Sequence, residues 1–162
     1  MKTILLIRHA KSGWESFQKD IERNLTGSGR ADAEKMAGYL LSKEIKIDLF
    51  VSSPAERAMQ TAAIFSEIYR GLRPGVFEQL YEPEMDGFVS TIQSLDDQYD
   101  SAAVFSHNPG ITDFANSVAT VRINNMPECG IFCIESAIDE WKDFSAEKSR
   151  FLFFASPETI GR

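Results

Sequence analysis

Short apolar runs alternate with longer stretches in which apolar residues recur at helical spacing. The apolar runs predict strands at residues 4–7, 48–52, 76–80, 102–105, 131–134 and 151–154. A helix is predicted over residues 27–44, where Thr26 can cap the first turn. Two more are predicted to open at Pro54 and Pro109, each behind a capping residue, and shorter ones near residues 88–95 and 141.

This order of elements predicts an α/β fold. Strands and helices alternate through most of the chain, which favours a three-layer α/β/α arrangement with a mostly parallel sheet of about six strands. In such a sheet, ligands bind at the carboxyl ends of the strands. The 162 residues contain no linker or internal repeat, so we expect one domain over residues 1–162.

Amino-acid composition and net charge argue against several classes of function. The chain is 43% hydrophobic, enough to form a core without disulfides or metals, and Cys129 and Cys133 lie in an apolar run as expected for reduced core residues. The net charge of -7, without a dense basic patch, argues against a nucleic-acid partner. No signal peptide and no apolar run of about 18 residues is found, which predicts a cytoplasmic protein without membrane association.

The chain contains two histidines, and each directly follows a predicted buried strand. The segments are Leu6-Ile7-Arg8-His9-Ala10 and Phe105-Ser106-His107-Asn108-Pro109. Because the carboxyl ends of parallel strands share one edge, the two imidazoles are expected to converge. The turn after the second strand directs Arg57 to the same edge. The predicted cluster is His9, His107, Arg8 and Arg57.

These side chains suit a dianionic phosphoryl group. Guanidinium groups offer paired donors to phosphate oxygens, and a neutral imidazole can attack phosphorus to form a phosphohistidine that water then hydrolyses. Each residue alone is more typical of an ordinary surface or core position, so the prediction depends on their coincidence. Paired histidines also suit a metal, but Asp113 lies beyond the turn and no third ligand has convincing spacing, so neither metal nor cofactor is predicted.

Four segments carry a family resemblance: Leu6-Ile7-Arg8-His9-Ala10-Lys11-Ser12, Leu25-Thr26-Gly27-Ser28-Gly29-Arg30, Ser52-Ser53-Pro54-Ala55-Glu56-Arg57-Ala58-Met59-Gln60-Thr61-Ala62 and Ser106-His107-Asn108-Pro109-Gly110. The chain resembles the histidine phosphatase, or phosphoglycerate mutase-like, superfamily, in particular its small SixA type of phosphohistidine phosphatase. The resemblance implies that His9 is the nucleophile and that Arg8, Arg57 and His107 hold the phosphoryl group. Arg23 is a candidate at the pocket rim, with a solvated loop charge as the alternative.

The chain departs from the family pattern at two places. Ala10 replaces the glycine that commonly follows the nucleophile. The carboxylic acid that protonates the leaving oxygen in phosphomonoesterases has Glu82 as its candidate here, after the predicted third strand. Three further acids surround it, so a solvated acidic loop is the alternative: Glu78, Glu84 and Asp86.

Three functions are compatible with this pattern. The first is hydrolysis of phosphohistidine on a signalling protein, favoured because only about twenty residues separate Tyr81 from the fourth strand, too few for a lid. The second is a phosphomonoesterase acting on a small metabolite or phosphoserine. The third is a phosphoprotein-binding module without turnover, which would need the arginines but no nucleophile. Direct phosphate contacts by Lys11, Ser12 or Asn108 are left open.

Overall fold

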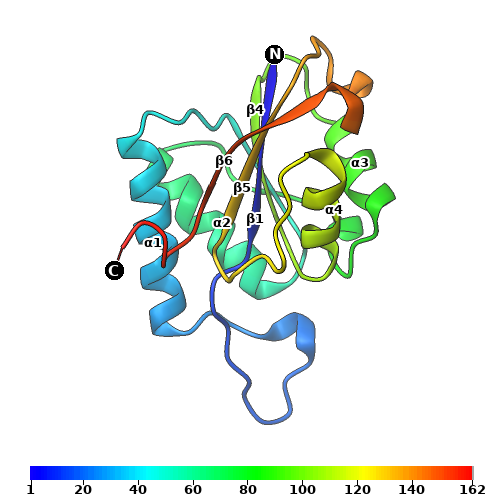
Figure 1. The fold of residues 1–162 in the computed structure, drawn as a ribbon. Coiled ribbons are helices and arrows are strands. Elements are labelled where there is room, and N and C mark those ends of the chain that lie inside the picture. Colours follow the sequence, from blue (N-terminus) through cyan, green and yellow to red (C-terminus); the bar gives the residue numbers. More distant parts are fainter. Residues whose placement is uncertain (162) are drawn as a thin grey trace.

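A six-stranded sheet runs through the centre of the protein in the computed structural model, which describes residues 1–161 (Figure 1). The strands lie in the order β3-β2-β4-β1-β5-β6, and β5 is antiparallel to both of its neighbours while the other pairs are parallel. Their bounds are β1 Lys2–Arg8, β2 Leu49–Ser52, β3 Gly75–Val76, β4 Ser101–Ser106, β5 Ile131–Ser136 and β6 Ser149–Ala155. The predicted mostly parallel sheet is confirmed.

Helices cover both faces of this sheet (Figure 1). One layer contains α1 (Gly27–Ser42) and α2 (Glu56–Tyr69), and the opposite layer contains α3 (Met85–Gln93) and α4 (Gly110–Val118). Within residues 1–161, four short 3₁₀ helices connect the elements: Asp20–Glu22, Glu78–Leu80, Trp141–Asp143 and Ala146–Lys148. The structure therefore has the predicted three layers.

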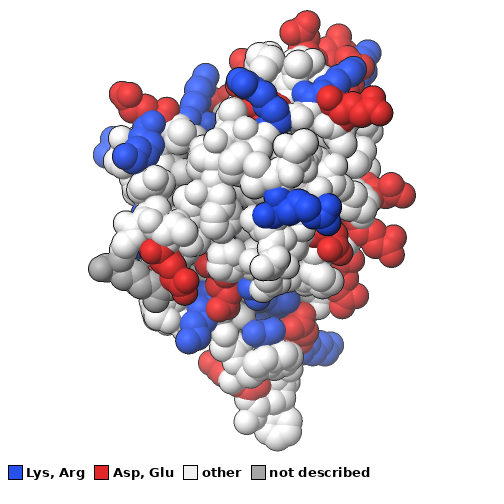
Figure 2. Space-filling model, viewed as in Figure 1, with Lys and Arg blue, Asp and Glu red and all other residues white. Residues whose placement is uncertain are grey.

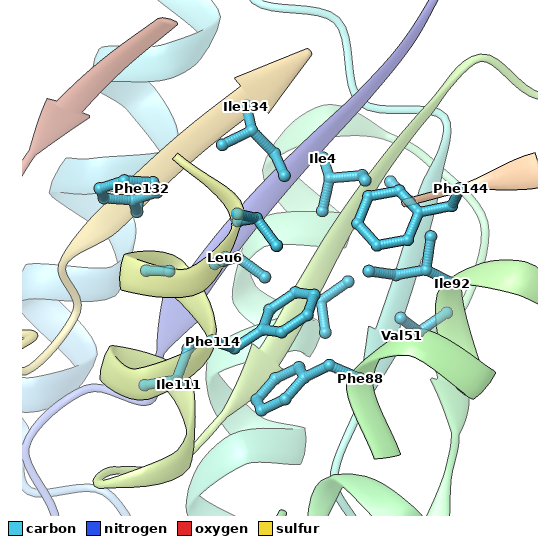
Figure 3. Packing of buried hydrophobic residues seen from close by; sticks show 14 of the residues in the cluster. Ile4, Leu6, Val51, Phe88, Ile92, Ile111, Phe114, Phe132, Ile134 and Phe144 are labelled. Carbon is cyan, nitrogen blue, oxygen red and sulfur yellow. The ribbon is translucent and has the colours of Figure 1, made fainter. Parts of the chain in front are cut away.

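The central strand β1 contributes to two hydrophobic cores. Ile4 and Leu6 pack with α3 and α4 in one core, shown in Figure 3, while Leu5 and Ile7 pack with α1 and α2 in the other. All four side chains are fully buried. The apolar run at the N-terminus is thus a strand buried on both faces, as predicted.

The two cysteines belong to the core beneath α1 and α2. Cys129 and Cys133 are buried and form no disulfide, as expected. Burial raises the pKa of both thiols, that of Cys133 to about 12, so they stay protonated and unreactive at neutral pH.

The strand predicted at residues 76–80 is largely wrong. Only Gly75–Val76 pairs with β2, because β2 ends at Ser52, whose carbonyl accepts the Phe77 amide at 2.9 Å. The chain then turns through the 3₁₀ helix Glu78–Leu80 and buries Leu80 in the core. Leu80 and the half-buried Phe77 therefore pack against the core, while Val76 is exposed.

Helix starts differ from the predictions where proline follows a capping residue. Thr26 caps α1 as expected, with its Oγ1 accepting from the Gly29 amide at 3.0 Å. However, α2 begins at Glu56 and α4 at Gly110, later than predicted. Ser53 and Asn108 do not cap these helices: the Ser53 hydroxyl contacts His107 Nε2, and the Asn108 amide donates to the Met126 carbonyl.

Charged groups of both signs are mixed over the face of the molecule seen in Figure 2. Basic and acidic side chains lie side by side there and do not separate into two regions. Among residues 1–161, no helix combines the length and the apolar character needed to cross a membrane.

Candidate active site

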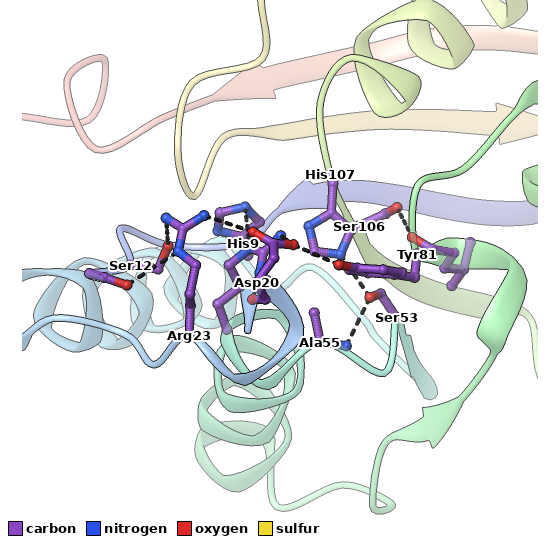
Figure 4. Close-up of polar contacts among 12 residues, drawn as sticks. His9, Ser12, Asp20, Arg23, Ser53, Ala55, Tyr81, Ser106 and His107 are labelled. Atoms are coloured by element: carbon purple, nitrogen blue, oxygen red, sulfur yellow. Dashed lines mark hydrogen bonds and ion pairs between the residues drawn. The ribbon is translucent and has the colours of Figure 1, made fainter. Parts of the chain in front are cut away.

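The carboxyl ends of three adjacent parallel strands bring the predicted residues together. Arg8 of β1 pairs with Ser106 of β4, and Ser52 of β2 pairs with Phe105. His9 and His107, the next residues of β1 and β4, therefore emerge side by side, with their ring centroids 5.1 Å apart (Figure 4). The structure thus places two histidines 98 positions apart at one edge of the sheet.

The His9 ring is held in one orientation. Its Nδ1 lies 2.8 Å from the carbonyl oxygen of Ala10, and a carbonyl only accepts, so Nδ1 carries the hydrogen in this contact. The lone pair is then on Nε2, which accepts a hydrogen bond from Arg57 Nε at 3.3 Å. His9 is 6% exposed, so Nε2 is a buried, unprotonated nitrogen beside a guanidinium group.

Burial and positive charge keep both imidazoles neutral. Burial, together with the nearby guanidinium groups of Arg57, Arg8 and Arg23, lowers the pKa of His9 to about 4, and the hydrogen bond to Ala10 acts in the opposite direction. Burial also lowers the pKa of His107 to about 3, with smaller contributions from His9 and Arg57. Both rings are therefore neutral at physiological pH, each with a hydrogen on one nitrogen only.

This neutrality can be observed directly, since the chain contains two histidines. We expect both imidazole signals in an NMR titration to report neutral rings at pH 6 and to titrate below about pH 5, because the folded-state pKa values are near 4 and 3. His107→Ala removes one signal and assigns the other. A midpoint near 6.5 for His9 would contradict the burial and charge described above.

Arg57 connects the nucleophile position to the pocket rim. It lies in the first turn of α2, and its side chain is 8% exposed. Its Nη1 donates to the Asp20 carbonyl at 2.8 Å and its Nη2 to Asp20 Oδ2 at 3.1 Å. Thr61 Oγ1 donates to the Arg57 carbonyl and accepts from the Ala10 amide, which ties α2 to the turn after His9.

His107 and Arg8 each carry an unpaired polar atom. His107 Nε2 lies 2.7 Å from Ser53 Oγ, and Arg8 Nη1 donates to the Met126 carbonyl at 3.0 Å. Their other atoms, His107 Nδ1 and Arg8 Nε, are buried without a hydrogen-bond partner, and no other buried side-chain polar atom in residues 1–161 is in this state. Unpaired buried polar atoms are rare in proteins, so two at one site indicate groups that meet a ligand.

Arg23 reaches the site through Asp20. Its Nη1 donates to Asp20 Oδ1 at 3.1 Å and its Nη2 to Ser12 Oγ at 2.7 Å, and its guanidinium group stacks on Trp14 at 4.3 Å from the ring centroid. Arg23 thus lies beside Asp20, and its role at the pocket rim stays a prediction. Its recorded contacts in the described part of the chain do not include either histidine.

Glu82 is not brought into this cluster. The residue is exposed, has a left-handed backbone with φ of 48°, and within residues 1–161 makes no hydrogen bond or ion pair with the four clustered side chains. The premise for its placement was the strand at 76–80, which is a turn instead. Its role as proton donor stays a prediction.

Asp20 is the acidic residue that the structure places at the site, and sequence reasoning did not find it. Its Oδ2 accepts from the Tyr81 hydroxyl at 2.7 Å as well as from Arg57, and the Tyr81 ring meets His107 edge-on at 5.6 Å. Although burial acts to raise it, hydrogen bonds from Tyr81, Arg23 and Arg57 hold the pKa of Asp20 at about 2. The sequence contains one weak signal for this role, because Asp20 is an acid three residues before Arg23.

The side chains together form a site for an anion. The site contains three guanidinium groups, two neutral imidazoles and the Asp20 carboxylate, with Glu128 near Arg8, so positive charge exceeds negative charge locally. In the described chain, no three His, Cys, Asp or Glu side chains are grouped so that they could hold a metal ion. The donors present suit the oxygens of a phosphoryl group.

Comparisons with known proteins agree with this geometry. An uncharacterized protein of Mycobacterium leprae is 26% identical over 93% of this chain and 99% of its own. The structure of a protein histidine phosphatase SixA complexed with tungstate superposes with a TM-score of 0.83 at 19% identity, covering 98% of this chain and 99% of the other. A mycobacterial glucosyl-3-phosphoglycerate phosphatase superposes with a TM-score of 0.66 at 13% identity, covering 96% and 98%. These structural matches confirm the phosphoglycerate mutase-like fold.

Residues 4–122 match the family described as histidine phosphatase superfamily (branch 1). This range includes both histidines, all three arginines of the site and Asp20. The match confirms the enzyme class expected from the sequence, a phosphatase. The chain therefore belongs to the histidine phosphatase superfamily, branch 1.

Proposed function

We propose that this enzyme is a metal-independent phosphatase that carries the phosphoryl group on His9 and hydrolyses phosphohistidine on a protein. The observation that carries the proposal is the buried, unprotonated Nε2 of His9 next to Arg57. A nitrogen in that state can attack phosphorus without first losing a proton. The neighbouring guanidinium groups supply the charge that such a reaction needs.

The reaction proceeds in two displacements. In the first, the Nε2 lone pair forms a bond to phosphorus while the bond from phosphorus to the leaving group breaks, and the leaving group takes up a proton. In the second, a water oxygen attacks the same phosphorus, the bond to Nε2 breaks, and inorganic phosphate and free His9 are regenerated. Each step transfers one phosphoryl group and needs no redox partner.

The buried donors stabilise the charge of the transition state. Arg8 Nε always carries a hydrogen, and His107 Nδ1 carries one when Ser53 donates its hydroxyl hydrogen to Nε2. Neither atom has a hydrogen-bond partner within residues 1–161, so a phosphoryl oxygen can bind them without breaking a hydrogen bond seen there. Fixed donors of this kind lower the barrier because they need no reorganisation during the reaction.

The surroundings of the site favour a phosphoryl group on a protein surface. The segment between Tyr81 and β4 contains α3, whose Phe88 and Ile92 are fully buried against the sheet, so this segment cannot fold over the site as a lid. Without a lid formed by this segment, the site can admit a side chain that projects from another protein. A leaving imidazole also depends less on an enzymic acid than an alkoxide does, in keeping with the exposed position of Glu82.

The substrate class can be tested with a signalling domain that carries labelled phosphohistidine. We expect release of inorganic phosphate together with transient, acid-labile label on the enzyme. Turnover of alkyl phosphates, measured in parallel, tests the second candidate function, that of a phosphomonoesterase. The fold shared with a glucosyl-3-phosphoglycerate phosphatase also supports this second candidate. Turnover of alkyl phosphates without turnover of phosphohistidine would replace the first candidate with the second.

Glu82→Gln separates the same two candidates. If phosphohistidine is the substrate, we expect the substitution to change its turnover less than about threefold, because Glu82 contacts none of the clustered side chains and the leaving imidazole is a good leaving group. For an alkyl phosphate that needs Glu82 as its acid, turnover should fall by about 10²-fold or more. Steady-state kcat on both substrates gives the answer, with Glu84→Gln on the same loop as the matched control. A large loss with phosphohistidine would make Glu82 part of the mechanism.

A further inference from the structure

Two arginines of the site already donate hydrogen bonds to a carboxylate of the protein itself. The Asp20 carboxylate accepts from Arg57 Nη2 through Oδ2 and from Arg23 Nη1 through Oδ1, each at 3.1 Å. The Asp20 carbonyl accepts from Arg57 Nη1 at 2.8 Å. One acidic residue therefore holds two guanidinium groups, which is the arrangement expected around a bound phosphoryl group.

This carboxylate also connects to both histidines through one side chain each. Tyr81 donates its hydroxyl to Asp20 Oδ2 at 2.7 Å and meets His107 edge-on. On the other side, Arg57 joins Asp20 to His9 Nε2. Figure 4 shows Asp20 between Arg23 and Tyr81, beside His9. Asp20 thus lies within the group of side chains that the phosphoryl group must contact.

We propose that Asp20 is a resident competitor for the arginines of this pocket, which an incoming phosphoryl group displaces. The inference rests on the proposed function in taking the pocket as the phosphoryl site. While Asp20 holds Arg57, Arg57 Nε stays hydrogen-bonded to the lone pair of His9 Nε2. Displacement of Asp20 frees Arg57 to move onto the phosphoryl oxygens and exposes the nucleophile to phosphorus.

The surroundings of Asp20 permit this displacement. Its side chain is 41% exposed, against 8% for Arg57, and the 3₁₀ helix Asp20–Glu22 contributes no buried residue. The loop that carries it is closed at its base, where Ser12 bridges to Leu25 and the Thr26 amide donates to the Lys11 carbonyl at 2.9 Å. Asp20 can therefore leave Arg57 through a local movement that does not disturb the sheet.

Binding of tungstate to Asp20 variants tests the proposal. The apparent affinity for an anion is reduced by the fraction of protein in which the competitor is bound, so we expect Asp20→Asn and Asp20→Ala to lower the calorimetric Kd for tungstate by about tenfold or more. Glu22→Gln removes a charge from the same turn without touching the arginines and should change Kd less than about twofold. An unchanged or raised Kd in both Asp20 variants would show that Asp20 positions the arginines, and would overturn the proposal.

A crystal structure of the wild-type protein with tungstate gives a second measurement that does not depend on a variant. Displacement predicts that Asp20 Oδ2 no longer lies within hydrogen-bond distance of Arg57 Nη2, whereas an unmoved Asp20 with tungstate bound overturns the inference. Failure of the proposed function can be told apart from failure of this inference. If Asp20→Asn binds tungstate more tightly but the wild-type protein hydrolyses no phosphate, the proposed function is wrong and the competitor role of Asp20 stands. If the wild-type protein hydrolyses phosphohistidine but Asp20→Asn binds tungstate like wild type, the proposed function stands and only the competitor role of Asp20 is wrong.

Discussion

His9→Ala should reduce phosphatase turnover by about 10⁴-fold or more, the largest effect expected of any single substitution in this enzyme. The substitution removes Nε2, the atom proposed to accept the phosphoryl group, and leaves the guanidinium groups around it. Without that atom, only the binding of the substrate and its contacts with Arg57 remain. Turnover and transfer of labelled phosphate to the enzyme are the quantities to measure.

His107→Ala is the matched control for His9→Ala. It removes the other imidazole of the pair, which is proposed to donate to a phosphoryl oxygen but not to carry the phosphoryl group. The enzyme should then react more slowly and still acquire acid-labile label on His9, whereas His9→Ala should acquire none. His9→Ala should also retain affinity for tungstate, which shows that the pocket is intact. Label on His9→Ala, or turnover within about tenfold of wild type, would contradict the covalent mechanism.

The strand ends at the carboxyl edge of the sheet, where the candidate active site lies, can be predicted because the local sequence determines them. In β1, four fully buried apolar residues are followed at once by Arg8 and His9, and in β4 a buried run ends at Ser106 and His107. A parallel sheet then brings both polar ends to one edge whatever the loops do. The pairing of the two histidines depends only on these facts, which is why it can be predicted from sequence, whereas Arg57 comes from the first turn of α2, the helix that follows β2.

The acidic partner of the site could not be predicted in the same way. Asp20 meets Arg57 and Tyr81 across 37 and 61 positions of the chain, and no periodic pattern relates these residues. A buried guanidinium group does require a counter-charge, but the 24 acidic residues of the chain offered no means of choosing one. The prediction of Glu82 depends on a strand directly before it, and that segment forms a turn that leaves Glu82 exposed.

Arg57→Ala should lower kcat/KM by about 10²- to 10³-fold, the second largest effect expected. Among residues 1–161, Arg57 is the one side chain that hydrogen-bonds to both His9 Nε2 and Asp20, so its loss removes transition-state charge and the link between nucleophile and rim. Arg57→Lys keeps the charge but lacks the planar paired donors, and should recover only part of the lost activity. Arg30→Ala, on the exposed side of α1, is the control and should resemble wild type.

A second readout shows whether Arg57 acts on His9 through its charge. The Arg57 guanidinium lowers the pKa of His9, and removing a positive charge favours the protonated imidazole, so the His9 midpoint should rise from about 4 toward 6.5 in Arg57→Ala. In that variant, a larger fraction of His9 is protonated at pH 5 and cannot attack phosphorus, so activity should fall more steeply on acidification than in wild type. Arg57→Lys retains the charge and should hold the midpoint nearer to 4. An unchanged His9 midpoint in Arg57→Ala would mean that burial and the remaining guanidinium groups keep the nucleophile neutral, and that Arg57 serves the phosphoryl group only.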